Sequence, residues 1–537
     1  MDTMTNLSDK IPTYVSHVTE TLQKAGFEAY LVGGCVRDLL LEEQPKDWDV
    51  TTNATPEQII GLFEKTFYEN DYGTVGVAVS HETRENPKTV GFRTPPQRAE
   101  RATQKTRSEA TMFSEVPVGA VSQIGVTHET IIVEVTPYRT ETTYSDSRHP
   151  DSVLFGQKLE EDLQRRDFTV NALAYDPDKG QIIDLYNGQK DIKDRVIRAV
   201  GESTERFGED ALRILRAVRF STELGFDIEP KTKEAVKTLA PNLEKISKER
   251  IRDEFIKIIM SAHAMQGIIL AHELGVLQHI APELEKGIGV EQNGDHIYVV
   301  WEHNIRALNH AVESKWPLHV RLAALFHDIS KPETRRWSEE KKDWTFYGHD
   351  VVGGRVAKKI MQRLKFPGKI TDVVSMLVRY HLFFSDVEKI TLSAVRRIVK
   401  NVGPENVWDL MKVRACDRIG MGRPKEKPYR LRKYEAMIEE AMRAPVSVGM
   451  LKIDGSKIME ITGEKPGPRL GWMLHAFLEE VLDDPEKNTD EYLTKRLKEL
   501  AALPDDELKK LGERGKEEKD KKEAEEVSEI RKKHWVK

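Results

Sequence analysis

Two neighbouring stretches near the start of the chain, Tyr30-Leu-Val-Gly-Gly-Cys-Val-Arg-Asp38 and Lys46-Asp-Trp-Asp-Val50, decide the fold class. The first stretch predicts a strand that turns through Gly33 and Gly34 into a helix. Glycines let the backbone approach a ligand closely, and the start of a helix offers free N–H groups. Arg37, one turn into that helix, could reach a phosphate. The plainer alternative is an ordinary turn.

The second stretch places two carboxylates, Asp47 and Asp49, two residues apart. On a strand, alternate residues share a face, so both side chains would point the same way. Two like charges side by side repel each other unless something binds them, and Mg²⁺ is the natural partner of carboxylate oxygens. The alternative is a polar turn that enters an edge strand.

A third acid, Glu134, interrupts the apolar run that begins at Ile131. A carboxylate embedded there is costly unless it is paired or binds a metal. Three acids on neighbouring strands could hold two Mg²⁺ ions, one to activate a hydroxyl and one to neutralise a leaving group. The alternative is a glutamate on an edge strand that faces water.

The length and composition predict several domains. A chain of 537 residues is too long for one compact core. The formal net charge is −6, so an RNA-binding surface would have to be a local patch. The two cysteines lack the spacing of a zinc site, and no apolar stretch approaches the ~20 residues of a membrane helix. Without a basic start followed by an apolar run, we expect a cytoplasmic enzyme.

Patterning along the chain predicts an α/β head followed by all-α domains. Strands are expected at 29–32, 76–79 and 131–135, in a small mixed sheet with helices on one side, and from about 159 the pattern is helical almost throughout. The expected units are a head at 11–158 with an inserted loop at about 81–128, a neck at 159–225, a helical body at 226–290, a histidine-rich domain at 291–425, a helical tail at 426–504, and a charged end at 505–537 that is a frayed helix or disordered.

The second half of the chain carries an ordered series of metal-ligand types. Imidazole and carboxylate suit divalent transition metals as well as Mg²⁺. Histidines on helices are usually structural, but this series raises the expectation of a metal site. Its members are His303, His327, Asp328, His349, His381 and Asp417.

Seven motifs resemble, in order, the class II tRNA nucleotidyltransferase and bacterial poly(A) polymerase family. They are LVGGCVRDLL (31–40), KDWDVTTNATPEQI (46–59), DYGTVGVAV (71–79), EVTPYR (134–139), LEEDLQRRDFTVNALAYD (159–176), EDALRILRAVRFSTELGF (209–226) and ISKERIRDEF (246–255). The histidine series resembles the HD phosphohydrolase domain found in some members. The segment GTVGVAVS resembles the CCA-adding branch, whereas the chain has Arg148-His149 where paired arginines are typical.

The resemblance implies roles for the matching residues. Asp47 and Asp49 would be the metal-binding catalytic pair with Glu134 as third acid, and Gly33, Gly34 and Arg37 would contact the triphosphate. The residues expected to bind the nucleotide are Arg166, Asp167, Asn171, Asp210, Arg213, Arg216 and Arg219. Asp210 and Arg213, if on one helix face, would read the base edge as a protein template for CTP and ATP. The plain alternative is an internal salt bridge.

The expected activity is template-independent addition of CCA to the 3′ end of tRNA from CTP and ATP, with Mg²⁺. First-choice ligands for a transition metal in the HD domain would be His303, His327, Asp328 and Asp417, with His349 and His381 at a second metal or the substrate. The alternatives are a poly(A) polymerase, a partial CC- or A-adding enzyme, an HD phosphohydrolase with an RNA-binding head, or a nucleotide-binding protein without turnover. The oligomeric state is not predicted.

Overall fold

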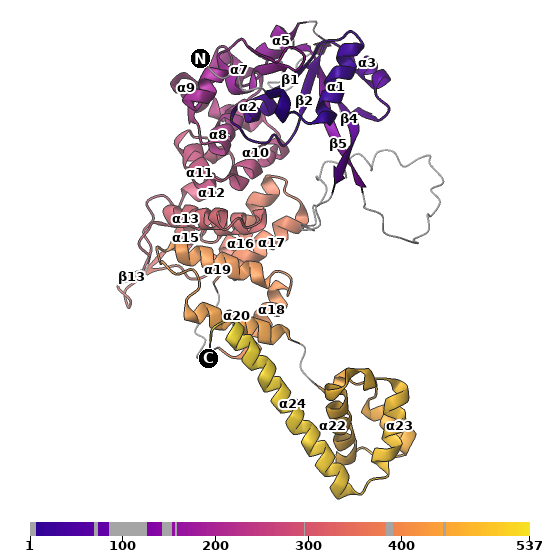
Figure 1. Ribbon diagram of the computed structural model, residues 1–537. Helices are drawn as coiled ribbons and strands as arrows, with labels where there is room; N and C mark the ends of the chain where they lie inside the picture. The colour runs from indigo at the N-terminus through magenta and orange to yellow at the C-terminus, as the bar shows by residue number, and fades with distance from the viewer. Residues whose placement is uncertain are drawn as a thin grey trace. The chain divides into compact units, whose positions relative to one another are not determined.

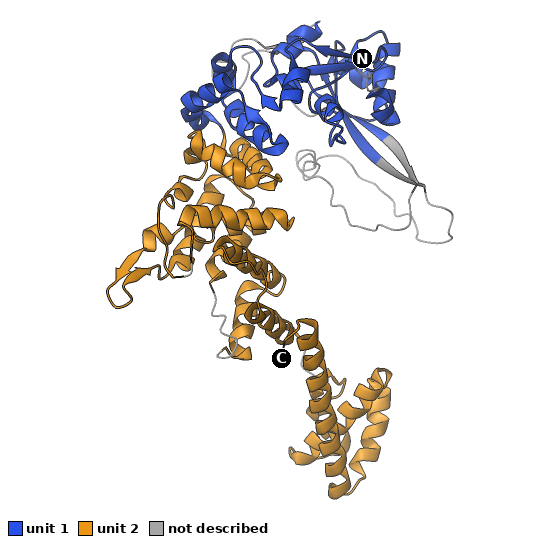
Figure 2. Cartoon of the chain, turned by 60° about the vertical axis from the view of Figure 1, so that its left-hand side comes forward, with its two compact units in different colours: residues 1–246 blue, residues 247–537 orange. Residues whose placement is uncertain are grey.

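The computed structural model describes residues 7–68, 73–84, 126–141, 153–155, 158–294, 296–382, 390–443 and 447–536. The chain divides into two compact units, residues 1–246 and residues 247–537, which Figure 2 shows in different colours. This boundary falls inside the stretch that the sequence assigns to the helical body. Within the described ranges, no helix is both long and apolar enough to cross a membrane.

The first unit is built on a seven-stranded mixed sheet with the strand order β3-β4-β5-β2-β1-β8-β9. β2 runs parallel to β5, and every other neighbouring pair in this sheet is antiparallel. The mixed sheet predicted for the head is therefore confirmed. Its strands are β1 (Ala29–Val32), β2 (Asp49–Thr52), β3 (Thr66–Tyr68), β4 (Val75–Arg84), β5 (Val126–Pro137), β8 (Leu173–Asp176) and β9 (Gln181–Asp184).

Helices cover one face of the β4–β5 part of this sheet. α1 (Thr13–Lys24) packs against β4, and α3 (Pro56–Leu62) packs against both strands (Figure 1). The fully buried residues alternate along the two strands, as expected for strands with one covered face: Val75, Val77, Val133 and Val135. The residues between them lie on the opposite face: Gly76, Ala78, Ile132 and Glu134.

The sheet extends further along the chain than the sequence indicated. Residues from about 159 were expected to be helical almost throughout, but β8 and β9 add two strands beside β1. All four residues of β8 are buried, because this strand lies between two others. A strand buried on both faces lacks the alternation by which it would be recognised.

Phe168 centres the helical part of the first unit. It is fully buried, with its ring centroid 6.4 Å from that of Phe207 and 5.7 Å from that of Phe220. The packing holds the segment around residue 168 against α7 (Ser203–Glu209) and α8 (Leu212–Leu224). The remaining elements of this unit are α2 (Gly34–Leu40), α5 (Leu159–Gln164), α6 (Gly188–Asp194), α7 (Ser203–Glu209), α8 (Leu212–Leu224), α9 (Pro230–Leu239), and the short pairs β6 (Arg139–Glu141) with β7 (Val153–Phe155) and β10 (Val196–Ile197) with β11 (Asp227–Ile228).

The second unit is almost entirely helical, as predicted. Its helices are α10 (Lys248–Met260), α11 (Ala264–Glu273), α12 (Pro282–Glu285), α13 (Val300–Glu313), α14 (Leu318–Phe326), α15 (Lys331–Thr334), α16 (His349–Arg363), α17 (Gly368–Tyr380), α18 (Leu392–Val402), α19 (Val407–Gly420), α20 (Tyr429–Met442), α21 (Gly455–Thr462), α22 (Pro468–Asp483), α23 (Asp490–Ala501) and α24 (Asp505–Lys533). A hairpin of β12 (Arg336–Ser338) and β13 (Asp343–Thr345) interrupts them. α13 packs on α14 and α19, and α17 packs on α14 and α16, which together form one bundle.

The inserted loop expected at about 81–128 is shorter at both ends. β4 continues to Arg84 and β5 begins at Val126, so the two strands form a long antiparallel pair (Figure 1). The sequences His81-Glu-Thr-Arg and Thr127-His-Glu-Thr are polar throughout, so they carry no apolar alternation that would identify a strand. Residues 85–125 lie outside the described ranges.

The charged end of the chain differs from the frayed or disordered segment expected there. It forms α24, which packs along α22 (Figure 1). Leu508 is fully buried, and the backbones come close at two glycines of α24: a Cβ on Gly515 would lie 2.1 Å from the carbonyl oxygen of His475. Charged side chains add partners, since Arg514 pairs with Glu479. Close backbone packing and ion pairs thus hold α24 against α22, although this segment has few apolar side chains to bury.

We predict opposite effects for two glycine-to-alanine changes in this helix pair. Gly515→Ala should loosen α24, because overpacking against the α22 backbone costs about 1–3 kcal/mol, more than the gain in helix propensity. Gly471→Ala, in α22 with open space around its Cβ position, should stabilise the pair by about 0.5–1 kcal/mol. Hydrogen exchange and tryptic cleavage within α24 measure both effects, and unchanged protection in Gly515→Ala would contradict the packing argument.

Candidate functional site

Asp49 and Glu134 are brought together by the parallel pairing of β2 with β5. Asp49 is the register partner of Glu134, and Val50 is that of Val135. Residues in register on neighbouring strands point to the same face, and the strands lie about 4.8 Å apart. The backbone N–H of Glu134 also donates to the carbonyl of Trp48 at 3.2 Å. Two of the three predicted acids therefore lie side by side on the open face of the sheet.

Asp47 lies before β2 and not on it. The strand begins at Asp49, and Asp47 is exposed in a bend, so the argument from strand alternation does not apply to this pair. The two carboxylates nevertheless interact electrostatically. Burial raises the pKa of Asp49, the Arg166 guanidinium opposes that rise, and the charge of Asp47 adds to it. An arginine and two carboxylates thus meet at the start of β2.

The glycine turn requires glycine at its first position. Gly33 has φ +80°, and its N–H donates to the carbonyl of Leu173 in β8 at 3.1 Å. A Cβ on Gly33 would lie 2.8 Å from Nη1 of Arg166, so the missing side chain makes room for that guanidinium. Gly34 then begins α2, where a Cβ would be 3.7 Å from Nη2 of Arg37. The turn therefore brings β1, α2 and Arg166 together.

A chain of hydrogen bonds connects α2 to the segment that follows α5. Arg37 is buried, and its Nη1 donates to Oδ1 of Asn171 at 2.6 Å. Nδ2 of Asn171 donates to Oδ1 of Asp167 at 3.3 Å, and Nε of Arg216 donates to Oδ2 of Asp167 at 2.7 Å. Burial alone would raise the pKa of Asp167, but Arg216 lowers it to about 2. These four predicted residues form one connected network.

Asp162 is a site residue that the sequence reasoning did not single out. Its carboxylate is fully buried and accepts from Nε of Arg165 at 3.0 Å and from Nη2 of Arg166 at 3.2 Å. Thr51, two residues after Asp49 on β2, donates its hydroxyl to the same group at 3.5 Å. Spacings of three and four residues on a helix could have identified these ion pairs. Asp162 thus holds Arg166 beside the strand that carries Asp49.

The expectation that Asp210 and Arg213 share one helix face is wrong. α7 ends at Glu209, Asp210 is extended with φ −135° and ψ 104°, and α8 begins at Leu212. Oδ1 of Asp210 accepts from the N–H of Leu212 at 3.0 Å, which favours the start of a new helix over continuation of the old one. Nη1 of Arg213 donates to Oε2 of Glu209 at 2.7 Å, the internal salt bridge that was the plain alternative.

Three predicted arginines surround the ring of Phe220 on α8. The guanidinium carbons lie 5.4 Å (Arg37), 5.1 Å (Arg216) and 3.7 Å (Arg219) from the ring centroid. Arg219 also pairs with Glu223 at 2.5 Å. Stacking on an aromatic face orients a guanidinium without neutralising its charge. Phe220 therefore positions cations beside Asp167, a role that no motif pattern indicated.

The histidine series of the second unit converges on Asp328. Its Oδ2 lies 3.0 Å from Nε2 of His303 and 3.4 Å from Nε2 of His327. Its Oδ1 lies 3.2 Å from Nε2 of His349 and 3.5 Å from Nε2 of His381. Asp417 approaches the first two imidazoles, with its Oδ1 3.5 Å from Nε2 of His303. All six predicted residues are buried and lie in one cluster.

Backbone carbonyls fix the orientation of three of these imidazoles. Nδ1 of His327 lies 2.7 Å from the carbonyl of Ala324, Nδ1 of His349 2.6 Å from that of Phe346, and Nδ1 of His381 2.7 Å from that of Val378. With Nδ1–H donated to a carbonyl, Nε2 carries the lone pair of the neutral ring. Each lone pair then points at the shared carboxylate, which is the arrangement that ligates a divalent metal.

His296 is a further candidate ligand that the sequence did not reveal. It could hold an ion together with His303, Asp328 and Asp417, and a second group consists of Asp328, His349 and His381. Lys331 lies beside both groups, its Nζ 2.6 Å from Oδ2 of Asp328. His296 lies in a loop before α13, and it belongs to no sequence motif that would have identified it as a ligand. Asp328 is common to the two groups and could bridge two ions.

The donor set fits a divalent cation. Burial alone would lower the pKa of His327, but Asp328 and Asp417 raise it to about 10, so the carboxylates favour a positive charge between them. Within the described part of the chain, Oδ1 of Asp328 and Nδ1 of His303 are buried without hydrogen-bond partners. A metal would satisfy the first of these atoms, because a carboxylate oxygen is a preferred ligand.

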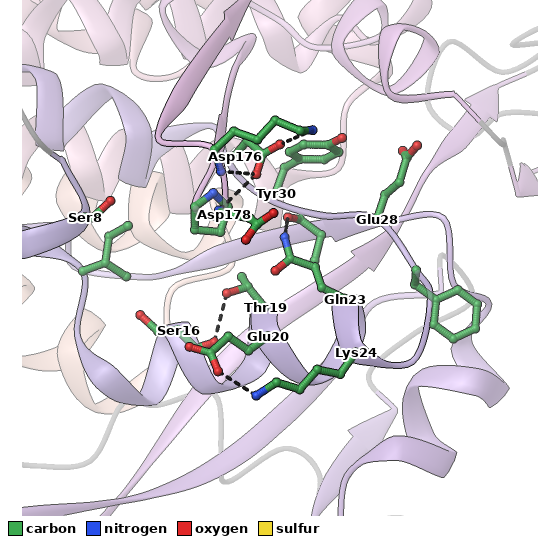
Figure 3. Close-up of a pocket in the computed structure, with 15 residues that line it drawn as sticks. Ser8, Ser16, Thr19, Glu20, Gln23, Lys24, Glu28, Tyr30, Asp176 and Asp178 are labelled. Atoms are coloured by element: carbon green, nitrogen blue, oxygen red, sulfur yellow. Dashed lines mark hydrogen bonds and ion pairs between the residues drawn. The ribbon is translucent and has the colours of Figure 1, made fainter. Parts of the chain in front are cut away.

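A cavity of about 320 Å³ opens onto this cluster. Three cations line it, Lys331, Lys341 and Arg414, and Tyr347 stands at its edge with three quarters of its surface exposed. A separate hollow of about 660 Å³ lies beside α1 (Figure 3). Thr19, Tyr30 and Asp176 are among the residues that line the second hollow, and none of the predicted site residues does.

Comparisons with known proteins match these regions in the same order. A family model described as "Poly A polymerase head domain" matches residues 29–118 and 96–198. One described as "Probable RNA and SrmB- binding site of polymerase A" matches residues 225–288, and "HD domain" matches residues 300–419.

Several relatives and solved structures that this chain resembles are named CCA-adding enzymes. One from Leuconostoc citreum is 39% identical over 50% of this chain, which spans only 55% of that relative's length. One from Lactobacillus delbrueckii subsp. bulgaricus is 32% identical over 90% of this chain and 98% of its own length. The crystal structure of the Bacillus stearothermophilus CCA-adding enzyme in complex with CTP matches with a TM-score of 0.54 and 27% identity, covering 90% of this chain and 96% of that one. The chain therefore belongs to the CCA-adding enzyme family of nucleotidyltransferases.

Proposed function

We propose that this protein adds CMP, CMP and AMP to the 3′ end of tRNA, from CTP and ATP and without a nucleic-acid template. The observation that carries the proposal is the arrangement on three adjacent strands. The glycine turn ends β1, Asp49 begins β2, and Glu134 lies in register with it on β5. A tRNA substrate is consistent with action in the cytoplasm, which we include in the proposal.

The first unit would bind the nucleotide along its hydrogen-bonded network. Gly33 and Gly34 would let the triphosphate approach the backbone, with Arg37 and Arg166 beside it, because charge-assisted hydrogen bonds from arginine suit phosphate oxygens. Asp162 would hold Arg166 in place, as its contact at 3.2 Å indicates. The attacking 3′-hydroxyl would displace pyrophosphate at the α-phosphate beside Asp49.

Carboxylate oxygens of Asp47 and Asp49, with Glu134, would hold divalent cations, which we propose to be Mg²⁺. Oxygen ligands of this kind are those that Mg²⁺ prefers, and the raised pKa of Asp49 fits a carboxylate whose charge is costly without a cation. When bound, the cations would supply activation of the hydroxyl and neutralisation of the leaving charge.

Base selection would depend on Asp210, in the junction between α7 and α8, and on Arg213, in the first turn of α8, although the two do not share a helix face. A carboxylate only accepts hydrogen bonds and a guanidinium only donates them. The amino groups of cytosine and adenine can donate to Asp210, and their ring acceptors can accept from Arg213. Uracil and guanine present the opposite pattern at those positions.

Extension of a truncated tRNA tests the proposal directly. A transcript that ends at the discriminator base should gain two C residues with CTP alone, then one A when ATP is added, and then stop. Long A tails would instead identify a poly(A) polymerase, and arrest after CC even with ATP would identify a CC-adding enzyme. No extension under any condition, with pyrophosphate release absent, would overturn the proposal.

Replacing the in-register acids should abolish this reaction. Asp49→Asn and Glu134→Gln should each lower the rate of CMP addition by about 10³-fold or more, because metal-assisted stabilisation is worth several kcal/mol. Removal of divalent cations should stop the wild-type protein, and Mg²⁺ should restore it but not the variants. Single-turnover kinetics measure the rates, and near-normal addition by Asp49→Asn would refute its assignment.

Asp210→Ala should weaken selection of the base. We expect kcat/KM for CTP to fall by about 10- to 100-fold, since hydrogen bonds to charged groups are worth about 1.5–3 kcal/mol. The preference for CTP over UTP should fall with it. Asp194→Ala serves as the control, because Asp194 is exposed on α6 and forms a surface ion pair with Lys190. An unchanged CTP:UTP ratio in Asp210→Ala would count against the template role.

A second candidate activity, phosphoester hydrolysis, is favoured by the convergence of four imidazoles and two carboxylates beneath the 320 Å³ cavity. Divalent metal held there could activate a water, and the lining cations could take a phosphate. Bis(p-nitrophenyl) phosphate, tested with Ni²⁺, Mn²⁺, Co²⁺ and Mg²⁺ in turn, is the probe.

His349→Ala should lower this hydrolysis by about 10²-fold or more while CMP addition to tRNA stays as in the wild type, because the two sites lie in different compact units. The Asp49→Asn variant should show the reverse pattern. Hydrolysis that persists in His349→Ala at the wild-type rate, or that no metal supports, would exclude an active HD site.

A further inference from the structure

A row of residues on the open face of the sheet continues the line of the two in-register acids. Asp49 pairs with Glu134, Glu134 pairs with Gly76 on β4, and Gly76 pairs with Phe67 on β3. Residues in register share a face, so Phe67 lies on the same side of the sheet as the acids. Ile132, two residues before Glu134 on β5, lies on that side as well.

This end of the row is apolar and exposed. Phe67 keeps 53% of its surface accessible and Ile132 keeps 50%, whereas the four valines on the other face, Val75, Val77, Val133 and Val135, are fully buried. Gly76 lies between them, and a Cβ there would be 3.1 Å from Cγ2 of Ile132 and 3.8 Å from Cβ of Phe67. The two side chains therefore border one shallow apolar surface, with glycine as its floor.

The strand order places this apolar surface on the side of the two acids that is opposite the glycine turn. The glycine turn that would take the triphosphate belongs to β1, on one side of the acids, and Phe67 lies on the other side. In-line displacement requires the attacking hydroxyl to approach opposite the leaving pyrophosphate. An RNA 3′ end must then arrive over β5, β4 and β3.

The distances from Glu134 to Phe67 and Ile132 also match the size of one nucleotide. Strands lie about 4.8 Å apart, so Phe67, two strands from Glu134, is about 10 Å from it across the sheet. Ile132 is about 6.6 Å along β5 from Glu134 at two residues of about 3.3 Å each. A base attached to a ribose whose 3′-hydroxyl sits at the acids would lie within this span.

We propose that Phe67 and Ile132 form the platform on which the 3′-terminal base of the RNA stacks while its hydroxyl is held at Asp49 and Glu134. The inference rests on the proposed nucleotidyl transfer. Aromatic and apolar faces accept any base, which suits an enzyme whose primer end changes with every addition. Phe67 and Ile132 are positioning residues for the primer, distinct from the groups that would bind the incoming nucleotide.

The neighbouring residue provides a matched control for the test. Tyr68 lies on the same strand and is 55% exposed, but it pairs with the buried Val75 and so points to the opposite face. Phe67→Ala, Phe67→Trp and Tyr68→Ala are compared in CMP addition to a transcript that ends at the discriminator base. A second transcript carries 2-aminopurine as its terminal base, whose fluorescence is quenched by stacking.

Phe67→Ala should lower kcat/KM for the transcript about 10-fold, as expected for loss of one stacking contact, and leave KM for CTP within about two-fold. Its 2-aminopurine complex should be brighter than that of the wild type. Phe67→Trp should restore both values, and Tyr68→Ala should behave as the wild type. Ile132→Ser should repeat the effect of Phe67→Ala.

Equal effects of Phe67→Ala and Tyr68→Ala, or an equal rise in KM for CTP, would overturn the platform. So would unchanged fluorescence in Phe67→Ala. Failure of the wild-type protein to extend any transcript would instead overturn the proposed function, and normal CCA addition with an indifferent Phe67 would overturn this inference alone.

Discussion

The parallel pairing of β2 with β5 is the constraint on which the rest of the site depends. It holds Asp49 and Glu134 opposite each other, although neighbouring carboxylates repel. The hydrogen bonds between the strands and the burial of the valines on the other face of the sheet outweigh that repulsion. The two carboxylates are therefore held in positions that suit a bound cation. An unstructured chain could not keep two such groups together, and the fold therefore does part of the electrostatic work before any ligand arrives.

Around this pair, buried charges are satisfied in chains and not singly. Asp162 pairs with two arginines, and Asn171 connects Arg37 to Asp167 through hydrogen bonds. The ring of Phe220 stacks against the guanidinium group of Arg219. A buried ion is costly unless its hydrogen bonds are complete, so each partner constrains the next. The result is a set of guanidinium groups held in defined positions near the glycine turn, in a form suited to a polyphosphate.

Much of this could be predicted from local sequence, and the exceptions have identifiable causes. The glycine turn, Asp49 and Glu134 were found because a glycine pair before a helix, closely spaced carboxylates and an acid within an apolar run are short-range patterns. β8 was missed because it is buried on both faces, and Asp210 was placed on a helix because a junction between two helices looks like one helix. His296 and Phe67 depend on long-range pairing, which a pattern along the chain does not contain.

The division of the chain at residue 246 has an evolutionary consequence. The acid pair belongs to a core of strands, and the imidazole cluster belongs to a core of helices, so substitutions that erode one set do not disturb the packing behind the other. Selection can then retain, retune or abandon either catalyst separately. Relatives that share the head can therefore differ in the histidine-rich bundle while the packing behind the acid pair is kept.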